Sequence, residues 1–282
     1  MGDLNELIRN ILKMSFDQQD EALAKILDIL QGGMASWEEV LKIGQVLKPI
    51  CMTIIAICLL IEVTQTLQRV DALTFEHAAK FLIKIVLAKV MIDIAPSLLL
   101  AIYQTSVSWI TGVKASGGDV KFGELIYESV GPLMAAQNGL WKTIGLFLTA
   151  TIVQLCIMGC AIITLVIAYG RMFELYVHLA VFPIPCSFLP LSGGNETFSR
   201  ITIRFLKSFA AIALQGVLMA IVIRVYTLVM TTYVRTKLNE VLRSGGNVVM
   251  WQLCLLMMLA SIVMVMALTK CGTWSKQIMD AA

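Results

Sequence analysis

The chain has 282 residues, of which 58% are hydrophobic and only 15% are charged, and its mean hydropathy is +0.82. Soluble domains carry roughly 25% charged residues, so the composition excludes an ordinary soluble protein and predicts an all-α, polytopic membrane protein. The net charge of +3 is too small to indicate nucleic-acid binding through bulk charge. The first residues are polar and acidic rather than an apolar leader, so we expect an internal span to direct insertion.

Residues 1–48 predict amphipathic N-terminal helices. Apolar residues recur at helical spacing on both sides of Ser15 in the first 31 residues, and Ser15 with Gln18 has the spacing of a capping box, so we expect two short helices here. They suit the membrane interface, or packing on a partner or on the chain itself, and their acidic excess favours packing. A second capping box, which starts at Ser36, opens the helix that leads into the membrane.

Residues 49–112 predict a first membrane hairpin with an interfacial helix. Its first span runs from about Pro49 to Leu67. The charged stretch that follows predicts an amphipathic interfacial helix to about Asp93 and then a span over residues 94–110. The alternative is one long tilted helix whose charges face other subunits.

Three charged residues of this hairpin are candidates for structural or partner contacts. Lys89 and Asp93 are four residues apart, which is the spacing of an intrahelical ion pair. Glu62 lies at the far end of the first span, where it is interfacial, paired with a neighbouring helix or part of a proton relay. A charge at the bilayer centre costs about 2.5–3.5 kcal/mol, so we expect each of these side chains to have a partner or to reach water.

Residues 113–142 predict a polar loop with a short helix that begins near Phe122. The central membrane core, residues 143–234, follows this loop. It opens with an uncharged run from Ile144 to Tyr169. At ~1.5 Å per residue, this run is long enough to cross a hydrocarbon core of ~30 Å with some tilt.

A charged cluster and a proline-broken segment come next. Arg171, Glu174 and His178 are three and four residues apart, so they share one face of a helix. Pro183 and Pro185 then interrupt an apolar segment, and irregular backbone at membrane depth persists only where protein or a water-filled cavity satisfies it. The pattern predicts the buried or pore-facing centre of an assembly. We expect a hydrogen-bonded cluster rather than a metal site or a catalytic dyad, because no third ligand has a useful spacing.

Residues 199–234 predict the next long helix, which carries a basic stripe. The stripe consists of Arg200, Arg204, Lys207 and, further inward, Gln215. It suits a snorkelling anchor at the membrane surface or a polar lining that contacts acidic partner residues. Arg224 lies deep in the apolar run and needs a carboxylate, a carbonyl or water, and the sequence offers Glu174 and Glu62 as carboxylates.

Residues 235–282 predict the last span, over about residues 248–268, and a C-terminal tail. The chain therefore has five clear spans, or six if Leu175–Leu191 crosses the membrane, and this segment decides on which side the C-terminus lies. The sequence contains no nucleotide-binding P-loop and no zinc-protease, hydrolase, kinase or dinucleotide motif. Its seven cysteines have no metal-ligand spacing and suit apolar packing. We expect no catalytic residue, no cofactor and no bound metal.

The central core also carries a residue pattern. An apolar helix is followed by Arg171-x-x-Glu174-Leu-Tyr176, by Pro183-Ile-Pro185, by a glycine-rich turn, and by Arg204-Phe-Leu-Lys207 with Gln215 further on. Over about residues 140–230 this pattern resembles the TrbL-like conjugal transfer proteins of Gram-positive integrative elements. Those proteins are grouped with the VirB/TrbL polytopic inner-membrane subunits of type IV secretion systems.

The resemblance implies a non-enzymatic scaffold and channel component in the cytoplasmic membrane. Such a subunit forms homo-oligomers beside a secretion ATPase and bitopic membrane proteins, and it contacts membrane lipid. It helps to pass single-stranded DNA with its relaxase, or effector proteins, through transient contacts. The residues that match the pattern are then expected to serve structure or partner contact. The intramembrane charges leave a solute transporter or ion channel as the alternative.

Overall fold

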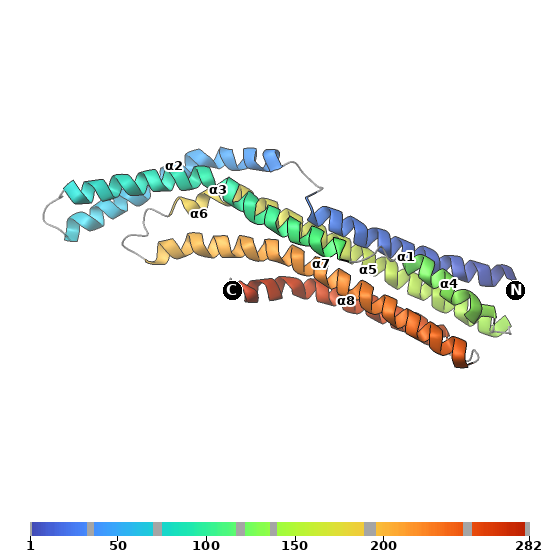
Figure 1. Cartoon of the computed structure of the whole chain (residues 1–282). Coiled ribbons are helices and arrows are strands. Elements are labelled where there is room, and N and C mark those ends of the chain that lie inside the picture. Colours follow the sequence, from blue (N-terminus) through green and yellow to red (C-terminus); the bar gives the residue numbers. More distant parts are fainter. Residues whose placement is uncertain are drawn as a thin grey trace. The chain divides into compact units, whose positions relative to one another are not determined.

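The computed structural model describes residues 2–32, 37–69, 75–116, 122–135, 140–188, 196–244 and 250–279. Throughout these ranges the regular structure is helical and contains no strand, which confirms the all-α prediction. The helices, shown in Figure 1, are α1 (Gly2–Leu30), α2 (Trp37–Arg69), α3 (Phe75–Ala115), α4 (Phe122–Ala135), α5 (Leu140–Val181), α6 (Pro183–Cys186), α7 (Glu196–Ser244) and α8 (Met250–Ile278).

Five helical segments among the described residues are long and apolar enough to cross a membrane, so the chain is a multi-pass membrane protein, as its composition predicts. They are Glu39–Ile61, Ile92–Ala115, Thr143–Cys186, Arg200–Thr236 and Cys254–Ile278. The described part of Leu175–Leu191 is not a separate crossing. α5 continues to Val181, and α6 ends the same apolar stretch at Cys186.

The N-terminal region holds a single helix where two were predicted. α1 runs unbroken over 29 residues, from Gly2 to Leu30. Ser15 does not cap a second helix, because its Oγ donates to the carbonyl of Ile11 at 2.8 Å, as a hydroxyl inside a helix does. No proline or glycine stands between Gly2 and Leu30, so the apolar stripes of the two predicted helices merge into one face. The second predicted cap, Ser36, lies outside the described residues.

α3 is also a single helix, of 41 residues, which agrees with the alternative to separate interfacial and spanning helices. It passes through Asp93 and Pro96 without a break, and its apolar segment, Ile92–Ala115, includes the predicted span over residues 94–110. α2 passes through Pro49 in the same way. Membrane helices tolerate an internal proline because neighbouring groups satisfy the backbone carbonyl that it leaves free.

The chain forms two compact units, and we describe each by itself. The first unit comprises Met1–Gln31, Trp109–Gly170 and Val217–Cys271. The second unit comprises Gly32–Ser108, Arg171–Gly216 and Gly272–Ala282.

The apolar face of α1 is buried in the core of the first unit. Ile8, Leu12, Phe16 and Ile26 are each at most 2% exposed. They pack in one cluster with apolar residues of α5, α7 and α8. Because the chain's own helices cover these side chains, α1 packs within the molecule rather than flat on a membrane surface.

α4 lies along α1 in the same unit (Figure 1). Arg9 of α1 donates from Nη2 to the carbonyl of Tyr127 at 3.0 Å, and its guanidinium lies 4.0 Å from the centroid of the Tyr127 ring. This geometry adds a cation–π contact to the hydrogen bond. At the other end of α1, Asp28 pairs with Lys114 of α3 at 3.2 Å.

Asp20 of α1 holds the first turn of α4. Its Oδ2 accepts the backbone N–H of Phe122 at 2.7 Å. The N–H groups of a first helical turn have no partner within the helix and favour a carboxylate. Burial raises the pKa of the Asp20 carboxyl from 3.8 to about 7, and the hydrogen bonds from Phe122 and Gly123 oppose this increase only in part.

Candidate functional site

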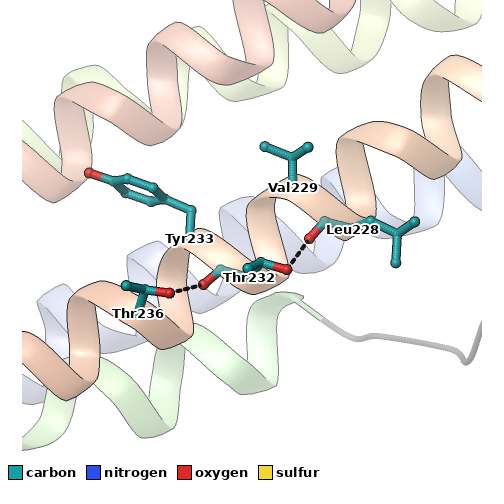
Figure 2. A pocket seen from close by; sticks show the side chains of 5 residues that line it. All are labelled: Leu228, Val229, Thr232, Tyr233 and Thr236. Atoms are coloured by element: carbon teal, nitrogen blue, oxygen red, sulfur yellow. Dashed lines mark hydrogen bonds between the residues drawn. The ribbon is translucent and has the colours of Figure 1, made fainter.

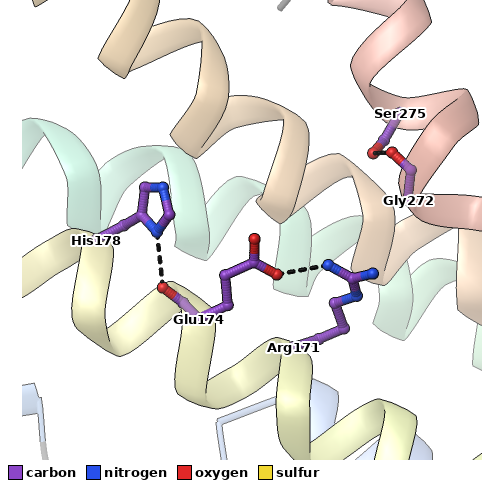
Figure 3. Close-up of polar contacts among 5 residues, drawn as sticks. All are labelled: Arg171, Glu174, His178, Gly272 and Ser275. Atoms are coloured by element: carbon purple, nitrogen blue, oxygen red, sulfur yellow. Dashed lines mark hydrogen bonds and ion pairs between the residues drawn. The ribbon is translucent and has the colours of Figure 1, made fainter. Parts of the chain in front are cut away.

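The polar cluster that the sequence places after the uncharged run lies on α5 in the second unit. Arg171 donates from Nη1 to Oε2 of Glu174, three residues on, and both side chains are partly buried (Figure 3). Each charge in the pair offsets the desolvation cost of the other in an apolar segment. The helical spacing predicted this contact, and it is present.

His178 joins the cluster through the backbone. Its Nδ1 lies 2.9 Å from the carbonyl oxygen of Glu174, one turn earlier, as Figure 3 shows. A carbonyl is only an acceptor, so Nδ1 carries the hydrogen. The ring of His178 packs against that of Phe205 of α7, with centroids 5.2 Å apart. The described contacts of His178 therefore give it a packing role and leave the carboxylate of Glu174 to Arg171.

Arg171 and Gln215 converge on the backbone of α8 at Gly272. A methyl group built on Gly272 would lie 2.8 Å from Arg171 Nη2 and 3.0 Å from Gln215 Nε2, so two polar side chains occupy the space of a residue side chain. Gln215 is 1% exposed, and its Nε2 has no hydrogen-bond partner among the residues that the structure describes. Ser275 donates from Oγ to the carbonyl of Gly272 at 3.1 Å (Figure 3). The cluster thus joins three apolar segments, on α5, α7 and α8.

The proline-broken segment is buried. Pro183 and Pro185 lie in the short helix α6, and both are buried. Thr202 of α7 donates from Oγ1 to the carbonyl of Pro185 at 2.7 Å, and the N–H of Ser187 donates to the carbonyl of Pro183 at 3.2 Å. Hydrogen bonds from protein groups therefore satisfy the irregular backbone here. Burial in protein is one of the two environments expected for this segment, and a water-filled cavity is the other.

The basic stripe on α7 changes from exposed to buried along its length. Arg200 and Arg204 are exposed, Lys207 is half-buried, and Gln215 is fully buried. This gradient fits an anchor whose first residues reach water or headgroups while its last residue enters the cluster. The predicted stripe therefore connects to the cluster through Gln215.

Arg224 lies in the first unit and is half-buried. Of its two predicted partners, Glu174 lies in the second unit and forms its described ion pair with Arg171. Glu62 is part of α2, but its side chain lies outside the described residues.

The ion pair at Asp93 differs from the predicted one. Its Oδ1 lies 3.0 Å from Nζ of Lys48, so the pair links α3 to α2. Lys89, the predicted partner one turn earlier, is exposed. A contact between helices was not visible in the sequence, because helical spacing reports only neighbours on the same helix.

Tyr176 belongs to an aromatic group in the second unit. Its ring meets that of Trp37 edge-on, with centroids 5.3 Å apart, and Trp37 packs against Tyr103 at 4.3 Å. The group connects α2, α3 and α5 within this unit and explains Tyr176 as a packing residue.

A second polar cluster, in the first unit, was not recognised from the sequence. Gln19 of α1 donates from Nε2 to Tyr226 Oη at 3.1 Å and to Ser261 Oγ at 3.2 Å, and these two hydroxyls are 3.1 Å apart. A signal was present: Gln19 is seven residues from both Leu12 and Ile26, so it shares their buried stripe.

A surface groove of about 440 Å³ lies along one face of α7 (Figure 2). Its lining residues are Leu228, Val229, Thr232, Tyr233 and Thr236. Thr232 and Thr236 donate to the carbonyls of Leu228 and Thr232, at 2.9 and 2.8 Å, so their hydroxyl hydrogens are already used within the helix. An open, largely apolar groove of this kind suits lipid or a neighbouring helix better than a polar ligand.

The potential metal ligands among the described residues do not gather in one place. Within them, no group of three or more His, Cys, Asp or Glu residues is placed to hold a metal ion. Six of the seven free cysteines are buried, and Cys156 is half-buried.

Comparison with known proteins links the chain to one family. A family model described as TrbL/VirB6 plasmid conjugal transfer like protein matches residues 35–183. The resemblance seen in the sequence extends over about residues 140–230. The family match overlaps it only at residues 140–183, and it also covers α2, α3 and α4. Neither the curated proteins nor the solved structures contain a match.

Proposed function

The chain belongs to the TrbL/VirB6 plasmid conjugal transfer-like family, and from this premise we propose that it is the integral membrane scaffold and channel component of a conjugative type IV secretion system. The family match over residues 35–183 is the observation that carries the proposal. The five apolar spans support it, because a subunit that forms a path across a membrane must itself cross that membrane.

The polar contacts between helices support a scaffold role. Arg171 and Gln215 meet at Gly272, and Lys48 pairs with Asp93, so polar side chains connect different helices within the second unit. Such contacts hold membrane helices in register where lipid supplies no hydrophobic drive for their association. In this proposal the chain has no enzymatic activity, and a separate secretion ATPase supplies the energy.

The proposal extends to location, assembly and cargo. The chain acts in the cytoplasmic membrane as a homo-oligomer, beside the secretion ATPase and bitopic membrane subunits. It helps single-stranded DNA with its relaxase to cross, through transient contacts.

An in-frame deletion of the gene in its native host, followed by mating, tests this role. Transfer should be lost, and plasmid-borne wild-type protein should restore it. An Arg171→Leu variant should restore transfer poorly, since it leaves Glu174 without its described ion pair. Gly145→Ala on the same helix should restore it fully, because nothing lies within 4 Å of its new methyl group. The tagged wild-type protein should co-purify with the secretion ATPase and with a second, differently tagged copy of the same chain.

Unchanged transfer after deletion would contradict the proposal. A purified protein that alone gives saturable solute flux in liposomes would favour a transporter or ion channel instead, which the intramembrane charges also suit.

A further inference from the structure

α1 has two faces of opposite character. One face is buried in the core of the first unit, as described above. The other face is exposed and mainly polar, with Leu7 and Met14 as its large exposed apolar residues. Its charged and amide residues are Glu6, Asn10, Asp17, Glu21, Lys25 and Asp28.

The centre of α1 lies level with the middle of an apolar span. Gln19 donates to Ser261 at 3.2 Å. Ser261 is near the middle of the uncharged run Met250–Thr269 of α8, which at ~1.5 Å per residue matches a hydrocarbon core of ~30 Å. Asp17 and Glu21 flank Gln19 by two residues on either side, so both charged side chains lie at the depth of that core.

Lipid cannot cover this charged face. Charged side chains at the bilayer centre are strongly disfavoured and face a protein interior or a water-filled cavity. Other helices of the same unit expose apolar side chains instead, including Leu148 and Leu155 of α5, Val225 of α7 and Val263 of α8. The first unit therefore has one surface suited to lipid and another suited to water.

α4 provides an independent observation. Its first turn is held by Asp20, next to Gln19, so a short helix begins near the depth of the hydrocarbon core. It adds exposed carboxylates at Glu124 and Glu128. Chain ends and short helices occur at this depth only where they are buried in protein or border water. α4, which packs along α1, thus adds carboxylates to the surface of the first unit.

We propose that the charged face of α1, together with α4, borders an aqueous passage through the membrane. This inference rests on the proposed role as a channel component and assigns the N-terminal helix to the lining. In this arrangement the apolar outer faces of α5, α7 and α8 contact lipid.

Cysteine accessibility in membranes tests the assignment. Glu21→Cys and Asn10→Cys place thiols on the charged face, and Leu148→Cys and Leu155→Cys place matched exposed thiols on α5. All four are made in a Cys156→Ala background, because Cys156 is the native cysteine that is not buried. A membrane-impermeant charged maleimide is added to right-side-out and inverted vesicles from cells that express the complete transfer system. Labelling after denaturation, minus that of the Cys156→Ala parent, measures the introduced thiol.

The two α1 positions should react at least about tenfold faster than the two α5 positions, because the reactive thiolate forms in water and not in lipid. Equal, fast labelling of the α5 positions would place the first unit outside the membrane and overturn the proposal. Protection of Glu21→Cys in both vesicle types would mean that protein covers the charged face, and would also overturn it. Neither result depends on DNA transfer by mating. The assignment of α1 to the lining can therefore fail while the proposed role in transfer is retained, and the reverse.

Discussion

Gln19 and Tyr226 are joined by a hydrogen bond of 3.1 Å from Nε2 to Oη, although 207 residues separate them in the chain. Ser261 completes the triangle, with its Oγ 3.2 Å from Gln19 Nε2 and 3.1 Å from Tyr226 Oη. All three residues are buried. Hydrogen bonds between buried polar groups therefore connect the N-terminal helix to α7 and α8.

Gln19→Ala should destabilise the protein by about 1–3 kcal/mol, because it removes two hydrogen bonds and leaves a cavity in the core of the first unit. Thermal unfolding in detergent, followed by tryptophan fluorescence, measures the change. Asn10→Ala on the exposed face of the same helix should shift Tm little. A Gln19→Ala protein with the wild-type Tm would show that the triangle does not stabilise the fold.

The Asp20 carboxyl should make stability depend on pH. Its folded pKa of about 7 exceeds the unfolded value of 3.8, so the folded state holds the proton over this interval while the unfolded state releases it. The contribution of Asp20 is therefore greatest below about pH 4 and is lost as the pH rises to 7, by at most about 1.4 kcal/mol per pH unit.

Asp20→Asn should remove this dependence and should be more stable than wild type at pH 7, since the amide oxygen can still accept the N–H of Phe122 without a charge. Asp20→Ala serves as the control. It loses both the charge and the acceptor, so it should also lack the pH dependence and should be less stable than Asp20→Asn at every pH by about 0.5–2 kcal/mol, the cost of removing a helix cap. Parallel stability curves of wild type and Asp20→Asn between pH 4 and 7 would contradict the assignment.

Gly272→Ala should displace the polar cluster of the second unit. The new methyl group would lie 2.8 Å from Arg171 Nη2 and 3.0 Å from Gln215 Nε2, and the buried Gln215 has little room to move. We expect a loss of about 1–3 kcal/mol, typical of overpacking. Gly159→Ala on α5 is the matched control, because nothing lies within 4 Å of its new methyl group. It should be neutral or stabilising by up to about 1 kcal/mol through helix propensity. Similar Tm values for both variants would argue against the close approach.

Gly32→Ala should be destabilising for two reasons. Gly32 has a φ of +103°, a backbone conformation that residues other than glycine rarely adopt. The methyl group of an alanine here would lie 2.8 Å from Tyr103 Oη. We expect a loss of about 1–3 kcal/mol, measured as a lower Tm. Adding Tyr103→Phe removes the nearest atom and should recover part of the loss, leaving the backbone strain. Complete recovery in the double variant would show that the φ at this position is not limiting.

Hydropathy located the spans because the signal is local. An uncharged run such as Ile144–Tyr169 must lie in an apolar environment wherever the rest of the chain goes, and it is part of a continuous helix. The contact between Arg171 and Glu174 was predictable for the same reason, since residues three apart on a helix are neighbours.

Contacts between helices were not predictable in this way. Asp93 pairs with Lys48 rather than Lys89, because two helices bring a cation closer than the next turn does. Gln19 could be placed on a buried stripe from the sequence, but its partners lie more than 200 residues away.

The sequence by itself determined that this is an all-α, multi-pass membrane protein and which family pattern it carries, because span length, charge content and residue spacing are properties of short stretches. Only the tertiary structure decided that α1 is one helix packed into the first unit, and that Arg171 and Gln215 meet at Gly272. Such contacts depend on how separate helices pack. The residues that surround a polar side chain in the sequence do not indicate which distant residue it will contact.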